Sequence, residues 1–260
     1  MGTALVTGAS AGLGRAFAIE IADRGHDVIL VARDAGRLEQ LAAEIERRYA
    51  VRTEVLPADL AERAQLQQVA DRIGDPARPV DLLVNNAGFG VRRRFSTGDL
   101  AEEERALDVM VRAVLVTSHA ASTAMRARGH GAILNVSSVA SFTAMGTYAA
   151  IKSWVTVFSE ALAMELAGTG VTVTAVCPGF IRTEFHDRAQ MDMSTLPDGW
   201  WLQAHRVAQD ALEAVSAGTV ISIPSARYKA LLGMVRLLPR PLVRAASGSL
   251  AIRRRLADDG

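Results

Sequence analysis

The chain has 260 residues, of which 50% are hydrophobic and 22% charged, and its formal net charge is +1. This length and composition predict one large folded domain and exclude a disordered chain, and the near-zero charge argues against a nucleic-acid partner. The one cysteine, Cys177, cannot form an internal disulfide, which favours a reducing compartment. We expect no signal peptide, because a strand pattern begins almost at once, and no membrane span, which needs roughly 20 apolar residues. These features predict a cytoplasmic protein.

The first informative stretch is MGTALVTGASAGLG, over residues 1–14. A short apolar run at 4–7 favours a strand, Gly8 breaks it, and a helical pattern follows up to Gly25. A glycine-rich turn between strand and helix lets the backbone approach a ligand, and the free amides of the first helical turn face an anion. The spacing Gly-x-x-x-Gly-x-Gly is one residue longer at the front than the usual dinucleotide fingerprint. We predict a phosphate cradle here, with a turn that simply needs glycine as the alternative. The residues predicted to line the cradle are Gly8, Ser10, Gly12, Leu13 and Gly14.

Short apolar runs then alternate with longer helical patterns. The predicted strands cover residues 4–7, 28–32, 51–56, 80–84, 132–136, 171–177 and 219–223. The predicted helices cover residues 14–24, 38–49, 66–73, 100–125, 148–166, 205–217 and 225–260. Strict alternation of strand and helix predicts an α/β fold with a parallel sheet that is covered on both faces. Because no repeat and no linker divides the chain, we predict a single domain over residues 1–260.

The end of the second predicted strand indicates which dinucleotide the fold would take. An acidic residue there accepts hydrogen bonds from the adenosine ribose, whereas a basic residue receives a 2′-phosphate. This chain has Arg33 at that position, and Asp34 follows one step later, in the turn. Because a guanidinium is a planar fork that suits a phosphate, we predict NADP(H) in preference to NAD(H). The alternative is an ordinary solvated arginine.

Two more strand ends would lie at the same edge of the sheet. Asp59 can accept a hydrogen bond from the adenine amino group while Leu60 packs on the ring, although a turn aspartate is the simpler explanation. The small-residue turn Asn86-Ala87-Gly88 follows the fourth strand and lets the backbone approach the cofactor ribose.

The residues with reactive chemistry are Tyr148 and Lys152, which are four apart on a predicted helix and therefore share one face. A phenol has an ordinary pKa of about 10, and a nearby ammonium favours the phenolate and lowers that pKa. Such a pair can protonate a carbonyl oxygen as a hydride arrives at the carbon. Ser138, just past the strand at 132–136, can donate a hydrogen bond to the same oxygen. Tyr-x-x-x-Lys also occurs by chance on surface helices, so the prediction depends on this serine and on the glycine turn.

Together these motifs resemble the short-chain dehydrogenase/reductase family, in that family's order and over about residues 1–185. The matching pieces are Thr7-Gly8-x-x-x-Gly12-x-Gly14, Asn85-Asn86-Ala87-Gly88, Ser138, Tyr148-x-x-x-Lys152 and Pro178-Gly179-x-Ile181-x-Thr183. The resemblance implies a Rossmann-like, doubly wound sheet of about seven parallel strands flanked by helices. It implies Tyr148 as the acid/base, Ser138 as the orienting donor, and Lys152 as a ligand of the nicotinamide ribose that tunes Tyr148. The residues it implies around the nicotinamide and its phosphate are Pro178, Gly179, Ile181 and Thr183. It makes Cys177 an inert core thiol.

The chain departs from the family pattern at three points. Met110 stands where these enzymes usually carry an asparagine, so only its backbone carbonyl could hold a relay water. Nine residues separate Ser138 from Tyr148, about three fewer than usual, which makes Ser137 the alternative orienting donor. Ile151 replaces a small polar residue, a change that we expect to be minor.

The remaining segments leave alternatives open. Arg92, Arg93 and Arg94 form a solvated charge run or contact an acidic substrate. Residues 182–201 are a predicted substrate lid, in which Trp200 and Trp201 either pack the lid or form a wall for a bulky apolar substrate. The basic, leucine-rich extension at 225–260 could lie on an anionic membrane surface, cover the substrate cleft or pack on a partner subunit. His186 and His205 lack metal-ligand spacing, so we predict no metal site.

The resemblance thus implies an NADP(H)-dependent oxidoreductase that moves a hydride between the nicotinamide and a small-molecule carbonyl or secondary alcohol. Met110 and the short loop raise an alternative from another class, a low-turnover NADP-binding module that senses redox state. The helices at 100–125 and 148–167 pair subunits in similar proteins, so we expect a homodimer or homotetramer. The substrate cannot be derived from the lid or the extension.

Overall fold

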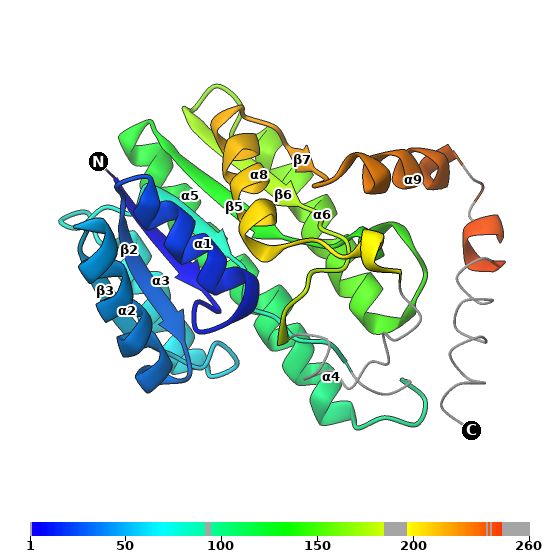
Figure 1. Cartoon of the computed structure of the whole chain (residues 1–260), viewed down its shortest axis with the longest axis horizontal. Coiled ribbons are helices and arrows are strands. Elements are labelled where there is room, and N and C mark those ends of the chain that lie inside the picture. The colour runs from blue at the N-terminus through cyan, green and yellow to red at the C-terminus, as the bar shows by residue number, and fades with distance from the viewer. Residues whose placement is uncertain (1, 92–94, 185–196, 238, 240, 246–260) are drawn as a thin grey trace.

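A seven-stranded sheet runs through the molecule with helices on both of its faces (Figure 1). This computed structural model describes residues 2–91, 95–184, 197–237, 239 and 241–245. The strand order is β3-β2-β1-β4-β5-β6-β7, and every pairing in the sheet is parallel. The strands are β1 Thr3–Thr7, β2 Asp27–Ala32, β3 Thr53–Pro57, β4 Leu82–Asn85, β5 Gly131–Val136, β6 Val171–Val176 and β7 Ile221–Ser222. The predicted α/β fold with a doubly wound sheet is confirmed.

The helices form two layers, one on each face of the sheet. The first layer contains α1, α2 and α8, whose apolar side chains share one core cluster, and the second contains α3, α5 and α6 around another. The α-helices are α1 Gly12–Asp23, α2 Ala35–Tyr49, α3 Arg63–Gly74, α4 Leu100–Leu107, α5 Ala113–Arg128, α6 Gly146–Glu165, α8 Ala204–Ser216 and α9 Ala226–Leu237. Strand order reverses between β1 and β4, and ligands of such sheets bind outside the carboxyl ends of the strands at this switch point.

The central strands are apolar throughout because both of their faces are covered. Leu5 and Val6 of β1 are fully buried, and each belongs to a different one of the two core clusters. A strand between two helix layers therefore reads as a continuous apolar run rather than an alternating one. Among the described residues, no helix has both the length and the hydropathy that are needed to cross a membrane.

Two predicted helical stretches are divided in the structure. The stretch at 100–125 is not one α-helix, because a π-helical turn, η1 Asp108–Arg112, separates α4 from α5. Turns of this type insert into α-helices at functional sites, and hydrophobic spacing does not reveal them. The extension at 225–260 is not one helix either, since α9 ends at Leu237 and Pro239 lies outside any helix. A proline lacks the amide hydrogen that a helix interior needs.

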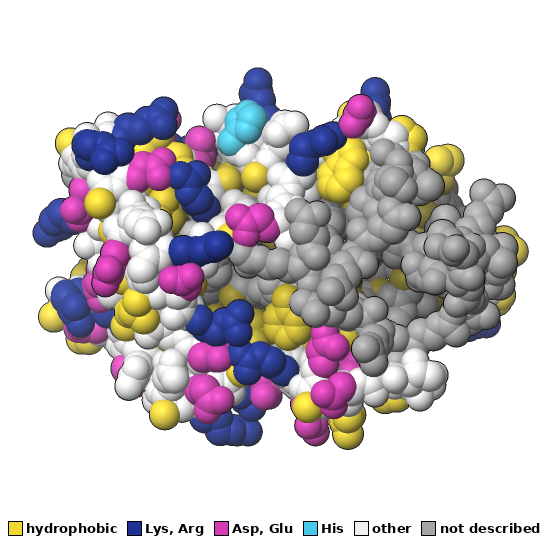
Figure 2. Space-filling model, turned by 60° about the horizontal axis from the view of Figure 1, so that its bottom comes forward, with side chains coloured by type: hydrophobic (Ala, Val, Ile, Leu, Met, Phe, Trp, Pro, Cys, Tyr) yellow, Lys and Arg dark blue, Asp and Glu magenta, His cyan; other side chains and the backbone are white. Residues whose placement is uncertain are grey.

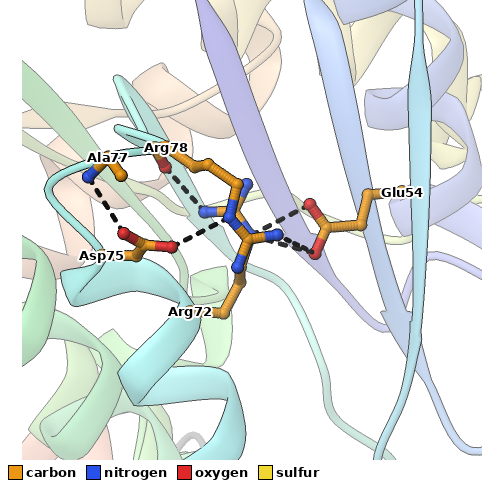
Figure 3. Close-up of polar contacts among 5 residues, drawn as sticks. All are labelled: Glu54, Arg72, Asp75, Ala77 and Arg78. Carbon is orange, nitrogen blue, oxygen red and sulfur yellow. Dashed lines mark hydrogen bonds and ion pairs between the residues drawn. The ribbon is translucent and has the colours of Figure 1, made fainter.

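An arginine network joins the end of α3 to the start of β3 (Figure 3). The side chain of Arg72 is 8% exposed, and its Nε donates to both oxygens of Glu54, each at 2.9 Å. Its Nη1 donates to the carbonyl oxygen of Arg78 at 2.7 Å. Arg78 is 60% exposed and pairs chiefly with Asp75 at 2.9 Å. The buried arginine therefore ties a helix, a strand and a loop together, whereas the exposed one forms a surface pair.

We predict that Arg72→Met destabilises the fold by about 1–3 kcal/mol, because Glu54 and a backbone carbonyl lose charged hydrogen bonds. Chemical denaturation measures this loss as a lower midpoint at an unchanged m-value. Arg78→Met is the matched control and should leave the midpoint nearly unchanged, because an exposed pair contributes little. Equal shifts for the two variants would contradict the assignment of stability to the buried arginine.

Candidate active site

The predicted cradle lies between β1 and α1, at the switch point of the sheet. Gly8 and Gly12 have positive φ angles of 68° and 53°, which other residues rarely adopt. A Cβ on Gly14 would lie 2.1 Å from the carbonyl oxygen of Gly8, so this glycine is required for the close packing of helix on strand. Ala11 caps α1 without a side-chain hydrogen bond, which leaves the first-turn amides for an external acceptor. The turn therefore fits the phosphates of a dinucleotide.

The turn after β4 braces the cradle. Nδ2 of Asn86 donates to the carbonyl oxygen of Thr7 at 2.9 Å, and the hydroxyl of Thr7 accepts the amides of Asn86 and Ala87 at 2.9 and 3.0 Å. A Cβ on Gly8 would lie 2.9 Å from the Cα of Ala87. The side chain of Asn86 is thus engaged in holding the two turns together, while Gly88 beside it is exposed.

Charged side chains lie at the predicted adenosine end of the site, just after β2 and β3. Arg33 is exposed, and its positive charge acts on the carboxylate of Asp59. Burial by itself raises the pKa of Asp59, but hydrogen bonds from Arg105 and the Ala61 amide, with the two arginine charges, hold that pKa below its ordinary value. Nη2 of Arg105 lies 2.6 Å from Oδ2 of Asp59. The aspartate is therefore ionised at neutral pH, and α4 reaches this end of the site through Arg105.

Leu60 differs from its predicted setting. Its side chain is 6% exposed and packs in the cluster beneath α3 and α5. Within the described residues it is a core side chain, which leaves little surface to cover an adenine ring.

The three predicted reactive side chains lie together beyond the end of β5. The hydroxyls of Ser138 and Tyr148 are hydrogen-bonded to each other. Nζ of Lys152 lies 5.7 Å from the centroid of the Tyr148 ring and donates to the carbonyl oxygen of Val136 at 2.8 Å. Helix α6 presents the tyrosine and the lysine on one face, as their spacing predicts. The shortened loop, which forms the 3₁₀ turn η2 Val139–Phe142, still brings the serine to the tyrosine.

The electrostatics of this cluster differ from the sequence prediction. Burial raises the pKa of Tyr148 to about 12, and its hydrogen bond with Ser138 offsets only part of this rise. Burial also lowers the pKa of Lys152 to about 8. The prediction that the lysine lowers the pKa of Tyr148 is wrong in this structure, because burial raises that pKa and the effect that opposes burial comes from Ser138.

The alternative donor, Ser137, has a different setting. It is 2% exposed, its hydroxyl donates to the carbonyl oxygen of Lys152 at 2.8 Å, and it shares a hydrogen bond with Thr156 at 2.7 Å. Ser137 therefore holds α6 against β5, and Ser138 is the serine that faces the tyrosine. Cys177 is fully buried beside Thr156, as expected of a core thiol.

Two departures from the family pattern form one apolar floor beneath the cluster. Met110, in the π-helical turn, and Ile151, on α6, are both buried and share a core with Ala106. Tyr148 packs against this core, and a Cβ on Gly88 would lie 3.1 Å from Sδ of Met110. The methionine and the isoleucine thus complement each other, which explains how a position that is polar in the family becomes apolar here.

Tyr228, which the sequence analysis did not indicate, packs on the turn at the predicted nicotinamide side. A Cβ on Gly179 would lie 2.0 Å from Cζ of Tyr228, so the tyrosine ring packs directly on this glycine. The Tyr228 hydroxyl accepts from the Phe180 amide at 3.2 Å and donates to the carbonyl oxygen of Trp200 at 2.9 Å. Helix α9 therefore joins the Pro178-Gly179 turn to the far end of the predicted lid.

The two ends of the lid are tied together at their base. Ile181 pairs with Leu202 in an isolated bridge, and Arg182 lies 2.8 Å from Asp198. The rings of Phe180 and Trp201 meet edge to face at 6.3 Å, whereas Trp200 packs against Tyr228. Trp200 thus packs the lid base, as one of the two alternatives predicted. The predictions for Arg92, Arg93, Arg94, His186 and lid residues 185–196 lie outside the described residues.

Other predicted positions are close to the cradle. Thr183 lies beside the glycine turn, since a Cβ on Gly12 would be 3.3 Å from its Cβ. Pro178, in the turn after β6, is buried. His205 is exposed on α8, and the described part of the chain contains no group of three or more His, Cys, Asp or Glu side chains that could hold a metal ion.

Sequence reasoning missed three functional candidates: Arg37, Arg105 and Tyr228. Arg37 lies in the first turn of α2, 3.5 Å from both Asp34 and Glu184, one helical turn from Arg33. Its position four residues after Arg33 was a usable signal, but the contacts of Arg105 and Tyr228 span 46 and 48 residues and leave no trace in local spacing.

Figure 2 shows Lys and Arg side chains interspersed with Asp and Glu over the described part of one face.

Comparisons with known proteins agree with these features. The family model for short chain dehydrogenase matches residues 2–194. Sulfoacetaldehyde reductase 2 of Chromohalobacter salexigens is 38% identical over 186 residues, which cover 70% of this chain and 73% of that protein. A short-chain dehydrogenase of Sphingobium yanoikuyae in complex with NADPH has a TM-score of 0.83 at 35% identity, over 91% of this chain and 94% of that one. A short-chain dehydrogenase/reductase of Burkholderia phymatum in complex with NAD has a TM-score of 0.78 at 26% identity, over 91% and 92%. This chain belongs to the short-chain dehydrogenase/reductase family of NAD(P)-dependent oxidoreductases, as its motifs predict.

Proposed function

We propose that the protein reduces a carbonyl compound at the expense of NADPH, with Tyr148 as the proton donor. The observation that carries this proposal is the cluster of Ser138, Tyr148 and Lys152 beyond β5, beside the turns that fit a dinucleotide. The nicotinamide, when bound, supplies a hydride to the carbonyl carbon. The side chains of this chain then have to hold the carbonyl oxygen and supply a proton to it.

The protonation state of Tyr148 agrees with a role as proton donor. A phenol with a pKa of about 12 is protonated at neutral pH and can give its proton to an oxygen that gains negative charge. The Ser138 hydroxyl can donate a hydrogen bond to the same oxygen, which stabilises that charge. Lys152, with a pKa lowered to about 8, can exchange protons near neutral pH and lies close enough to Gly88 to reach a ribose there.

The preference for NADP(H) is part of the proposal and is supported by Arg33 at the tip of β2, with Arg37 nearby. We predict that Arg33→Ala weakens NADPH binding by roughly 10–100-fold, the equivalent of one or two charged hydrogen bonds to a phosphate. NADH, which has no 2′-phosphate, should bind the variant as it binds the native protein. Titration calorimetry with both dinucleotides measures the two dissociation constants.

Arg47→Ala is the control for this prediction, because Arg47 is exposed, as Arg33 is, but lies at the far end of α2. It should leave both affinities unchanged. If Arg33→Ala weakened NADH as much as NADPH, the arginine would not read the 2′-phosphate and the preference would be refuted.

The substrate class follows from the walls around Tyr148. Phe89 and Val91 pack against the same apolar floor as Tyr148, and Phe180, directly after the predicted nicotinamide turn, meets Trp201 edge to face. These walls support an aldehyde or ketone with an apolar substituent. Because the Chromohalobacter relative is named a sulfoacetaldehyde reductase, a sulfonated aldehyde serves as the polar compound for comparison.

Oxidation of NADPH over a panel of aromatic, aliphatic and sulfonated carbonyl compounds tests the proposal. Turnover of at least one compound, and its loss in Tyr148→Phe, is expected. Tight NADPH binding with no turnover of any compound would instead favour the redox-sensing module. No observation among the described residues supports that alternative.

We also propose that the protein forms a homodimer or a homotetramer. Large apolar side chains are exposed along two neighbouring segments, Leu107 and Leu115 around η1, and Val157 and Met164 on α6. Exposed apolar strips on adjacent helices are typical of subunit interfaces. Light scattering on the purified protein measures the mass, and a monomer would refute this part.

A further inference from the structure

The outer side of the C-terminal segment has no partner among the described residues. Helix α9 packs through Tyr228 and Leu232, which are each 2% exposed, and Val243 is buried in the helical turn at 241–245. The side chains that point the other way are also apolar: Leu231 is 37% exposed, Met234 62% and Leu242 54%. We call the surface formed by these three residues the α9 face. In Figure 1, α9 extends from the edge of the sheet beyond β7, away from the strands that begin the chain.

The segment that carries the α9 face is basic. Residues 225–260 contain eight Arg and Lys and two Asp, Asp258 and Asp259, although the whole chain is nearly neutral. Arg227, Lys229 and Arg244 are exposed in the described part of this segment. Arg227 also shares one side of α9 with Leu231 and Met234, since they lie four and seven residues further on, and its Nη1 donates to the carbonyl oxygen of Gly199 at 2.7 Å.

Exposed leucine and methionine in a segment with an excess of cations suit the boundary of a bilayer that contains anionic lipid. The apolar side chains enter the headgroup region, and the cations meet lipid phosphates. We propose that the α9 face docks the protein on an anionic lipid surface. The segment lies on the membrane and does not cross it.

A second copy of the chain is a weaker occupant for this surface. A two-fold contact through the α9 face would bring the cations of both copies into one interface, and like charges across an interface are unfavourable. An anionic surface matches both the apolar and the charged part of the face.

The docked surface would lie next to the candidate active site. Helix α9 contacts the turn η2, which begins directly after Ser138, and Tyr228 packs on Gly179. Lipid docking does not depend on the proposed reaction, because it requires neither NADPH nor Tyr148. It would place the end of the molecule that carries the reactive cluster near the membrane.

Co-sedimentation of the full chain with phosphatidylcholine vesicles, with and without phosphatidylglycerol, tests the proposal. We expect binding to the anionic vesicles, little to the neutral ones, and release at high salt, since screening weakens surface electrostatics. The double variant Leu231→Ser/Met234→Ser should lower the bound fraction at least tenfold. The matched double variant Phe95→Ser/Leu100→Ser removes two other exposed apolar side chains and should bind as the native protein does.

The charges are tested separately. Lys229→Gln and Arg244→Gln should each weaken binding about fivefold, the effect of one cation near an anionic surface, whereas Arg47→Gln on the distant α2 should have no effect. No binding to anionic vesicles, equal binding to both vesicle types, or binding that the α9 variants leave unchanged would each overturn the proposal. The face would belong to a second copy if the native protein did not bind lipid and Leu231→Ser/Met234→Ser lost self-association in light scattering. That result would also overturn the proposal.

Discussion

Tyr148→Phe is expected to slow carbonyl reduction by roughly 100- to 10,000-fold, the range for loss of a general acid. The variant removes one hydroxyl, the group that bonds to Ser138 and that we propose gives the proton. The ring keeps its packing against the apolar floor of Met110 and Ile151, so the fold and the NADPH affinity should be preserved. Steady-state rates with the best carbonyl substrate, together with a calorimetric NADPH titration, separate loss of chemistry from loss of binding.

Tyr49→Phe is the matched control for this experiment, because Tyr49 ends α2 and lies away from the reactive cluster. Its rate and its NADPH affinity should equal those of the native protein. If Tyr148→Phe turned over at the native rate, the proton would have to come from another group, and the mechanism proposed for this cluster would be refuted.

Gly179→Ala is expected to destabilise the fold through a clash with a side chain of the C-terminal helix. The added Cβ would lie 2.0 Å from Cζ of Tyr228, so either the turn after β6 or helix α9 must move. Overpacking of this kind costs typically 1–3 kcal/mol, which lowers the melting temperature by roughly 2–12 °C in a domain of this size. Because the displaced turn is also the predicted nicotinamide contact, the KM for NADPH should rise as well.

The control for this prediction is Gly233→Ala, on the same helix as Tyr228 and with no atom within 4 Å of the added Cβ. An alanine in an exposed helix position should be neutral or slightly stabilising. In the double variant Gly179→Ala/Tyr228→Leu the smaller side chain relieves the contact, so its melting temperature should exceed the value expected from the sum of the single variants. Additive losses would show that the glycine and the tyrosine do not interact.

Local patterns predicted the elements that meet at the switch point. The glycine turn, the small-residue turn with Asn86 and the tyrosine–lysine spacing are all defined within a few residues, so their chemistry is visible in the sequence. The parallel sheet followed from the alternation of apolar runs with helical patterns. These features also predicted the family, which the comparisons confirm.

Features that depend on distant contacts were not predictable. The pairing of Met110 with Ile151 joins residues 41 positions apart and turns two apparent departures into one packed core. The role of Tyr228 depends on a ring that reaches the turn after β6 from the C-terminal helix. The pKa of Tyr148 rises rather than falls because burial is a property of the folded molecule, which the spacing of a tyrosine and a lysine does not encode.

The most direct test of the central claim follows a deuterium label from the nicotinamide to the product. The protein is incubated with NADPH that carries deuterium at C4, in both stereochemical forms, and with the carbonyl compound of fastest turnover. We predict that one of the two forms delivers a deuterium to the carbinol carbon of the alcohol, as mass spectrometry would detect. Oxidation of NADPH that leaves the alcohol unlabelled with both forms, or no alcohol from any carbonyl compound, would contradict the account.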